Sequence, residues 1–160
     1  MDSEVEVAVR IDHGQLIVCD PAAELDIDSY GDPAQRQGLA QWRGNRGVTV
    51  FTASNWTETH VKVRLSSERP TVVVDEWDHV VEGGLIVSSG QLHLYGPEDT
   101  GANEAAINLP SGSYSLIVCG RNFESTNEYG DEGSDAYTLL LWPGPALDRT
   151  VLKDGLSRMR

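Results

Sequence analysis

Apolar and polar residues alternate one by one along residues 59–65. On an extended chain one face carries aliphatic side chains and the other polar or basic ones: Val61, Val63 and Leu65 against His60, Lys62 and Arg64. A helix does not sort these residues in this way, because its faces repeat about every 3.6 residues. The segment therefore predicts a strand with one buried face. A chain with several such strands packs sheets together to cover those faces.

The N-terminal residues show the same alternation. Aliphatic side chains at positions 5, 7, 9 and 11 alternate with mostly charged neighbours, and a turn-forming pair, His13-Gly14, follows them. This spacing predicts that residues 15–19 return as the second strand of a hairpin.

Six further segments are rich in β-branched or aromatic residues, and we expect strands there: residues 47–52, 71–75, 85–88, 91–95, 113–119 and 136–142. Glycine, proline and serine predict tight turns at 88–90 and 110–112. No long segment has helical periodicity, although residues 34–42 fit a short helical turn. The pattern predicts an all-β fold, an antiparallel β-sandwich of the jelly-roll-like or Greek-key kind with long acidic loops. With 160 residues, we expect one β-sandwich domain over residues 1–160.

The chain is strongly acidic, with 25 acidic residues against 12 basic ones and a formal net charge of −13. Proteins that bind the phosphate backbone depend on basic surface, so we expect no direct contact with nucleic acid. The charge is explained by solubility alone or by a basic protein partner.

The N-terminal residues are polar and acidic, and no apolar run is long enough to cross a bilayer. We therefore expect a cytoplasmic protein that does not insert into a membrane. Cys19 and Cys119 are too few for a disulfide scaffold, so we expect two buried free thiols. A bridge between them would require their strands to be neighbours.

Residues 26–32 resemble a calcium-binding loop because carboxylates alternate before a glycine. The match is incomplete, since Tyr30 occupies a ligand position and Gln37 stands where a bidentate glutamate is needed. The four histidines lack the close spacing of a zinc site, and alternation places His60 and His93 on exposed strand faces. We predict no metal and no other cofactor.

Signatures of enzyme chemistry are missing from the sequence. It has no Gly-x-Ser-x-Gly elbow, no phosphate-binding P-loop and no dinucleotide fingerprint. A pair of catalytic carboxylates remains open among 25 acids, but no spacing favours one. We predict a protein that is not an enzyme.

Four tryptophans offer an alternative function, because aromatic rings stack on sugars. Trp77 and Trp142 adjoin apolar runs and fit a core, whereas Trp42 and Trp56 lie among polar residues and are candidates for exposed contacts. The alternative is a small-ligand or carbohydrate-binding β-sandwich module without catalysis.

One pattern is more specific than a general β pattern. The segment Leu-Pro-Ser-Gly-Ser-Tyr-Ser-Leu at residues 109–116 follows Gly-Gln-Leu-His-Leu at 90–94 and precedes Tyr-Thr-Leu-Leu-Leu-Trp-Pro at 137–143. Over residues 48–143 the chain resembles the competence protein J family, bacterial inhibitors of a DNA-entry nuclease. The resemblance implies a small cytosolic protein that binds and silences a nuclease, and an acidic chain suits the basic surface of such a partner.

Two long segments, residues 20–46 and 122–135, do not fit strands, and long loops in a compact domain are often functional. The second is the more acidic, and its carboxylates predict a surface that steers a basic partner such as a nuclease or toxin: Glu124, Glu128, Asp131, Glu132 and Asp135. A merely solvated loop would also explain these charges. We interpret the chain as an acidic binding protein, an inhibitor of a nuclease or an immunity-type protein.

Overall fold

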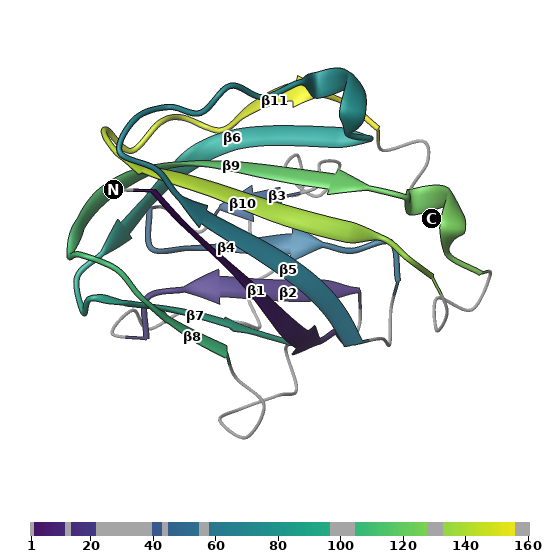
Figure 1. The fold of residues 1–160 in the computed structure, drawn as a ribbon, viewed down its shortest axis with the longest axis horizontal. Helices are drawn as coiled ribbons and strands as arrows, with labels where there is room; N and C mark the ends of the chain where they lie inside the picture. The colour runs from purple at the N-terminus through teal and green to yellow at the C-terminus, as the bar shows by residue number, and fades with distance from the viewer. Residues whose placement is uncertain are drawn as a thin grey trace.

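The computed structural model describes residues 2–11, 14–21, 40–42, 45–54, 58–96, 105–127 and 133–155. These residues form two β-sheets that face each other (Figure 1). Sheet A contains, in spatial order, β1 (Ser3–Arg10), β5 (Glu58–Leu65), β10 (Ala136–Pro143), β9 (Gly112–Arg121), β6 (His79–Val87) and β11 (Thr150–Lys153). Sheet B contains β3 (Ala40–Trp42), β4 (Gly47–Phe51), β2 (Gln15–Cys19), β7 (Gln91–Tyr95) and β8 (Ala105–Asn108). The all-β sandwich expected from the sequence is confirmed.

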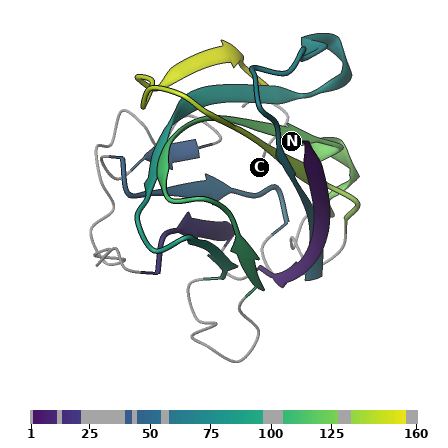
Figure 2. The same ribbon diagram turned by 60° about the vertical axis from the view of Figure 1, so that its left-hand side comes forward.

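Neighbouring strands of the described part run antiparallel with one exception. Figure 2 shows the two sheets in a view turned by 60° from that of Figure 1. β10 pairs parallel to β5 in the middle of sheet A, with Tyr137 opposite Val61 and Leu141 opposite Leu65. The sheet is therefore mixed, which differs from the purely antiparallel arrangement that we expected. Two short 3₁₀ helices, Val74–Glu76 and Phe123–Ser125, lie outside the sheets.

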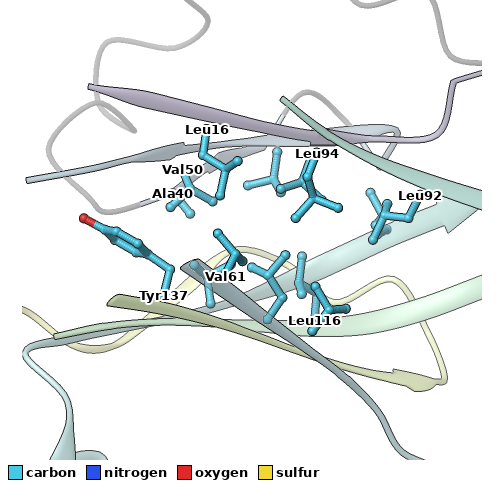
Figure 3. Packing of buried hydrophobic residues seen from close by; sticks show 14 of the residues in the cluster. Leu16, Ala40, Val50, Val61, Leu92, Leu94, Leu116 and Tyr137 are labelled. Carbon is cyan, nitrogen blue, oxygen red and sulfur yellow. The ribbon is translucent and has the colours of Figure 1, made fainter. Parts of the chain in front are cut away.

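The space between the sheets is filled by aliphatic and aromatic side chains from both layers (Figure 3). β5 shows how the sequence directs this packing, because Val61 is fully buried and Val63 nearly so, whereas Lys62 between them is exposed. Burying an aliphatic side chain of this size contributes about 1.5–3 kcal/mol. The prediction for residues 59–65 is confirmed both as a strand and in the face on which each side chain lies.

A second apolar cluster lies on the opposite face of sheet A. Ile117 and Cys119 of β9 pack there with Leu140 and Trp142 of β10, while the other face of β9 belongs to the main core. Val72 and its neighbours between β5 and β6 cover this cluster. β9 is consequently buried on both faces, which explains its uninterrupted apolar run at residues 116–119.

The N-terminal hairpin that we predicted is wrong. β1 pairs with β5 in sheet A, whereas β2 pairs with β4 and β7 in sheet B. The chain passes from one sheet to the other through Ile11, which is buried in the core, and reaches Gly14, whose φ of 64° suits a turn. The turns at 88–90 and 110–112 likewise connect strands of different sheets.

Other expectations also fail locally. Residues 71–75 form no strand, because they run outside the sheet and turn into a 3₁₀ helix, where the Glu76 amide donates to the Val73 carbonyl at 3.0 Å. The helical turn expected within 34–42 is wrong at its end, since Ala40–Trp42 is β3; residues 34–39 lie outside the described part. Strands β8 and β11 were not anticipated, as both are short.

Trp42 was expected to be exposed, and this is wrong: it is only 8% exposed and belongs to the core. Its ring lies against Gly83 of β6, where a Cβ atom would collide with it. The polar sequence around Trp42 concealed this packing, and Trp56 lies outside the described residues.

Both cysteines are buried and free, as expected. β2 and β9 belong to different sheets, so Cys19 and Cys119 are not on neighbouring strands. Burial raises the pKa of the Cys119 thiol to about 12. Burial also raises the pKa of Cys19, although a contact with the Tyr95 hydroxyl opposes the shift and Asp20 adds to it. No helix among the residues described has the length and apolar character needed to cross a membrane.

Candidate functional site

Hydrogen bonds join the two ends of the acidic segment that follows β9. We call the joined residues, Asn122, Ser125 and Ser134, the base of the segment. Asn122 has a left-handed conformation with φ of 61°, and its Nδ2 donates to the Ser134 carbonyl at 3.2 Å. The Ser125 hydroxyl donates to the Asn122 carbonyl at 2.6 Å and accepts from the Ser134 amide at 2.8 Å. These bonds hold the two ends of the segment together.

Phe123 fixes this base to the core. It is 2% exposed and stacks on Tyr137, with ring centroids 6.1 Å apart and an interplanar angle of 30°. Its amide donates to Asp78 Oδ2 at 3.1 Å. The next residue, Glu124, has an exposed side chain, as a partner-binding role requires.

Among the described residues, no other predicted site residue shares the exposed position of Glu124. Glu128, Asp131 and Glu132 lie outside the described residues. Asp135 is only 7% exposed, and its carboxylate accepts from the Ser54 amide at 3.2 Å and from the Ser54 hydroxyl at 2.9 Å. It also accepts from the Tyr137 hydroxyl at 2.7 Å. The structure therefore gives Asp135 an internal role, unlike that of Glu124.

The Asp135 network joins the two sheets. Tyr137 is the second residue of β10 in sheet A, and its hydroxyl accepts from the Ala53 amide at 2.7 Å. Ala53 and Ser54 follow β4 of sheet B in the chain. Burial and the Asp135 carboxylate raise the pKa of Tyr137 well above its usual value, so this hydroxyl remains a donor. Ser54 is fully buried, so its hydroxyl does not meet solvent or a substrate in this structure. The network stabilises the fold by satisfying a buried charge.

The segment at residues 109–116, which carries the family resemblance, forms a corner between the sheets. The Leu109 amide donates to the Gly90 carbonyl at 3.1 Å, and the Ser111 hydroxyl donates to the Ser88 carbonyl at 3.1 Å. The Tyr114 hydroxyl donates to the Pro110 carbonyl. The two turns therefore brace each other, and the motif residues have a structural explanation.

A depression of about 450 Å³ lies beside this corner. Its walls combine apolar surface from Leu65, Pro143 and Tyr114 with hydroxyls such as those of Ser67 and Ser111. Volume and lining are those of a site for a small, largely apolar ligand with a few hydroxyl contacts. Of the predicted acidic residues, the two that the structure describes, Glu124 and Asp135, do not line it.

The three histidines that the structure describes, His60, His79 and His93, are not grouped at one site. His60 is exposed, as expected, with Nδ1 3.5 Å from Glu6 Oε1, and His93 is half-buried beside Gln91. His79 is 1% exposed and accepts from the Gly155 amide at 2.7 Å. Within the part of the chain that the structure describes, no three histidine, cysteine or acidic residues are grouped to hold a metal ion. The calcium-like residues 26–32 lie outside that part.

Comparison with solved structures shows the same fold in two proteins. ComJ from Bacillus subtilis, the inhibitor of the DNA degrading activity of NucA, is 17% identical, with 89% of this chain and 96% of ComJ covered at a TM-score of 0.61. Crocagin biosynthetic gene J is also 17% identical, with 89% and 98% covered at a TM-score of 0.63. No protein-family model and no curated protein sequence matches the chain. The distant resemblance to competence protein J is confirmed at the level of the fold.

Proposed function

We propose that this chain is an acidic cytoplasmic binding protein that inhibits a nuclease, as a competence-nuclease inhibitor or an immunity-type protein does, and that it has no catalytic activity. One observation carries the proposal: the chain shares its fold, over 89% of its length, with an inhibitor of a DNA-degrading enzyme. The net charge of −13 supports it, because enzymes that act on DNA present basic surface to the phosphates.

The partner-binding surface that we propose is the acidic loop, defined here as Glu124, Glu128, Asp131 and Glu132. Glu124 is exposed directly beside the anchored Phe123, and the other three follow it in the sequence. Asp135 is left out because its carboxylate is committed to Ser54 and Tyr137. Charge complementarity of this kind acts mainly on the rate of association.

The test begins with capture of partners from the cell of origin on the immobilised protein, followed by a plasmid-degradation assay of the captured fraction. We expect a nuclease whose activity falls as free protein is added. Capture without any nuclease activity, or a captured nuclease that the protein does not inhibit, contradicts the proposal.

The surface is tested with a fourfold variant in which the acidic loop is neutralised to the corresponding amides. We expect association with the captured nuclease to slow by about tenfold or more at low salt, and the difference to shrink as salt screens the charges. The matched control neutralises four exposed acids elsewhere, Asp2, Glu58, Glu68 and Asp148. Equal association rates for the two variants would move the interface away from this loop.

The depression beside Tyr114 favours a second candidate, binding of a small ligand or carbohydrate without catalysis. Its volume falls within the range of small-molecule sites. Saturable chemical-shift changes at Ser111 and Tyr114 on titration with sugars would support this function, and their absence would remove it.

A further inference from the structure

The outward face of sheet A carries basic residues in an otherwise acidic molecule. Lys62 and Arg64 both project from this face of β5 and are exposed. On β1, Glu6 lies opposite Lys62 and Glu4 lies opposite Arg64. On the other side, Leu140 of β10 lies beside Arg64. The two cations therefore stand between the acidic residues of β1 and Thr138 and Leu140 of β10.

The segment between β5 and β6 runs over this face and makes it concave. Val72 and Trp77 pack against the outer cluster of sheet A. The Lys153 ammonium holds the segment in place by donating to the carbonyls of Val74 at 3.0 Å and Trp77 at 2.5 Å. A depression of about 240 Å³ remains between this segment and β5, which we call the outer-face pocket.

Cations surround the outer-face pocket. Lys62 and Arg64 line it on β5, and Arg121 lines it with its guanidinium carbon 5.1 Å from the centre of the Trp77 ring. Two acids, Glu4 and Glu76, also line it, which leaves a local excess of positive charge. Three of the chain's 12 basic residues thus meet at one small depression.

Within the described ranges, Lys62 and Arg64 form no salt bridge. Among the described residues, the ion pairs of this face join His60 to Glu6 at 3.5 Å and Arg69 to Glu82 at 2.6 Å, and neither Lys62 nor Arg64 takes part. By contrast, Arg69 is also satisfied by the Trp142 ring, 5.3 Å from its guanidinium carbon. An arriving anion would therefore find two cations that no salt bridge among the described residues occupies, with Glu4 as the acidic side chain that opposes its binding.

Apolar surface adjoins these cations. Leu140 lies in the wall at 8% exposure, and Val73 is 52% exposed beside it in the lining. A ligand with an apolar body would cover Val73 while its anionic group meets the cations, and both contacts favour binding. The pocket volume is below the usual range for drug-sized ligands, which limits the occupant to a small molecule.

We propose that the outer-face pocket binds a small organic anion, a carboxylate or phosphate monoester attached to an apolar group. Guanidinium groups match both anions by forming two parallel hydrogen bonds, and Lys62 adds a point charge. Glu124, the acidic-loop residue that the structure describes, does not line this pocket, and the proposal can be tested independently of nuclease inhibition.

The probes are phenyl phosphate and benzoate, with benzyl alcohol as the neutral analogue, titrated at low salt by calorimetry and by backbone chemical shifts. We expect both anions to bind with shifts at Thr138 and Trp77, and the alcohol to bind at least about tenfold more weakly. The anion that binds more tightly shows whether the pocket prefers a carboxylate or a phosphate. Equal binding of the alcohol, or no binding of either anion, overturns the proposal.

Single variants test which charges act. Arg64→Gln should weaken anion binding by about fivefold or more, whereas Glu4→Gln should strengthen it by removing repulsion. Arg10→Gln is the matched control, because Arg10 lies exposed on the same face of β1 but outside the pocket. A loss with Arg10→Gln equal to that with Arg64→Gln would mean that net charge alone is responsible. The gain with Glu4→Gln is a readout that misfolding does not produce.

Discussion

Asp135 shows that a cluster of acidic residues in a sequence does not share one environment. The sequence groups it with Glu124, yet its carboxylate is buried and accepts hydrogen bonds from Ser54 and Tyr137, whereas Glu124 is exposed. A carboxylate buried with a full set of donors is stable, because the donors replace the lost water. The short spacing to Tyr137, at the start of an apolar strand, is the sequence signal that separates Asp135 from the loop.

Asp135→Asn should lower the free energy of unfolding by about 1–3 kcal/mol, because the amide group would face donors at Ser54 or Tyr137. Glu124→Gln, the same chemical change on an exposed side chain, should alter it by about 0.5 kcal/mol or less. Urea denaturation of both variants measures the difference. Similar losses in the two would show that the Asp135 network does not stabilise the fold.

His79 should make the stability depend on pH. Burial lowers its pKa, and this outweighs the nearby Asp154 carboxylate, which acts in the opposite direction. Below about pH 6.5 the unfolded chain therefore takes up a proton that the folded chain resists, and the free energy of unfolding decreases as the pH is lowered. Denaturation at pH 7.5 and 5.5 should show a steeper fall in the native protein than in His79→Gln. Parallel pH profiles would contradict this role.

β5 is the element whose structure follows most directly from its sequence. Val61 faces the core and Lys62 faces outward because one-residue alternation assigns each side chain to a face. Val61→Asp should therefore cost about 3 kcal/mol or more by burying an unpaired charge. Lys62→Asp should cost about 1 kcal/mol or less, mainly through repulsion from Glu6 across the strands. Thermal melts of the pair check this, and a larger loss with Lys62→Asp would reverse the assigned faces.

Alternation predicts which residues form strands better than it predicts their partners. β1 and β2 have sound strand patterns, but a pattern carries no information on whether the next strand lies beside it or in the other sheet. Residues 71–75 fail for a related reason: β-branched residues form a strand only where a neighbouring strand pairs with their backbone. The outer-face pocket was visible in the sequence only as the basic face of β5, since the segment that encloses it comes from another part of the chain.

The two sheets depend on one core, because side chains from both layers pack together in the same cluster. We therefore expect a single cooperative unfolding transition, with tryptophan fluorescence and far-ultraviolet circular dichroism changing at the same urea concentration. Trp42 reports on the interior between the sheets and Trp142 on the outer cluster, so the fluorescence samples both. Two separated transitions would contradict a single domain.

The parallel pair of β5 and β10 also sets the order in which the chain acquires its structure during synthesis. β10 belongs between β5 and β9, yet it is made after both of them. At ordinary rates of translation, about 4–15 s pass between the synthesis of β5 and that of β10. Until then the facing edges of β5 and β9 lack their native hydrogen-bond partner, and such edges attract other strands. The growing chain is therefore most exposed to mispairing and most dependent on chaperones just before residues 136–143 emerge from the ribosome.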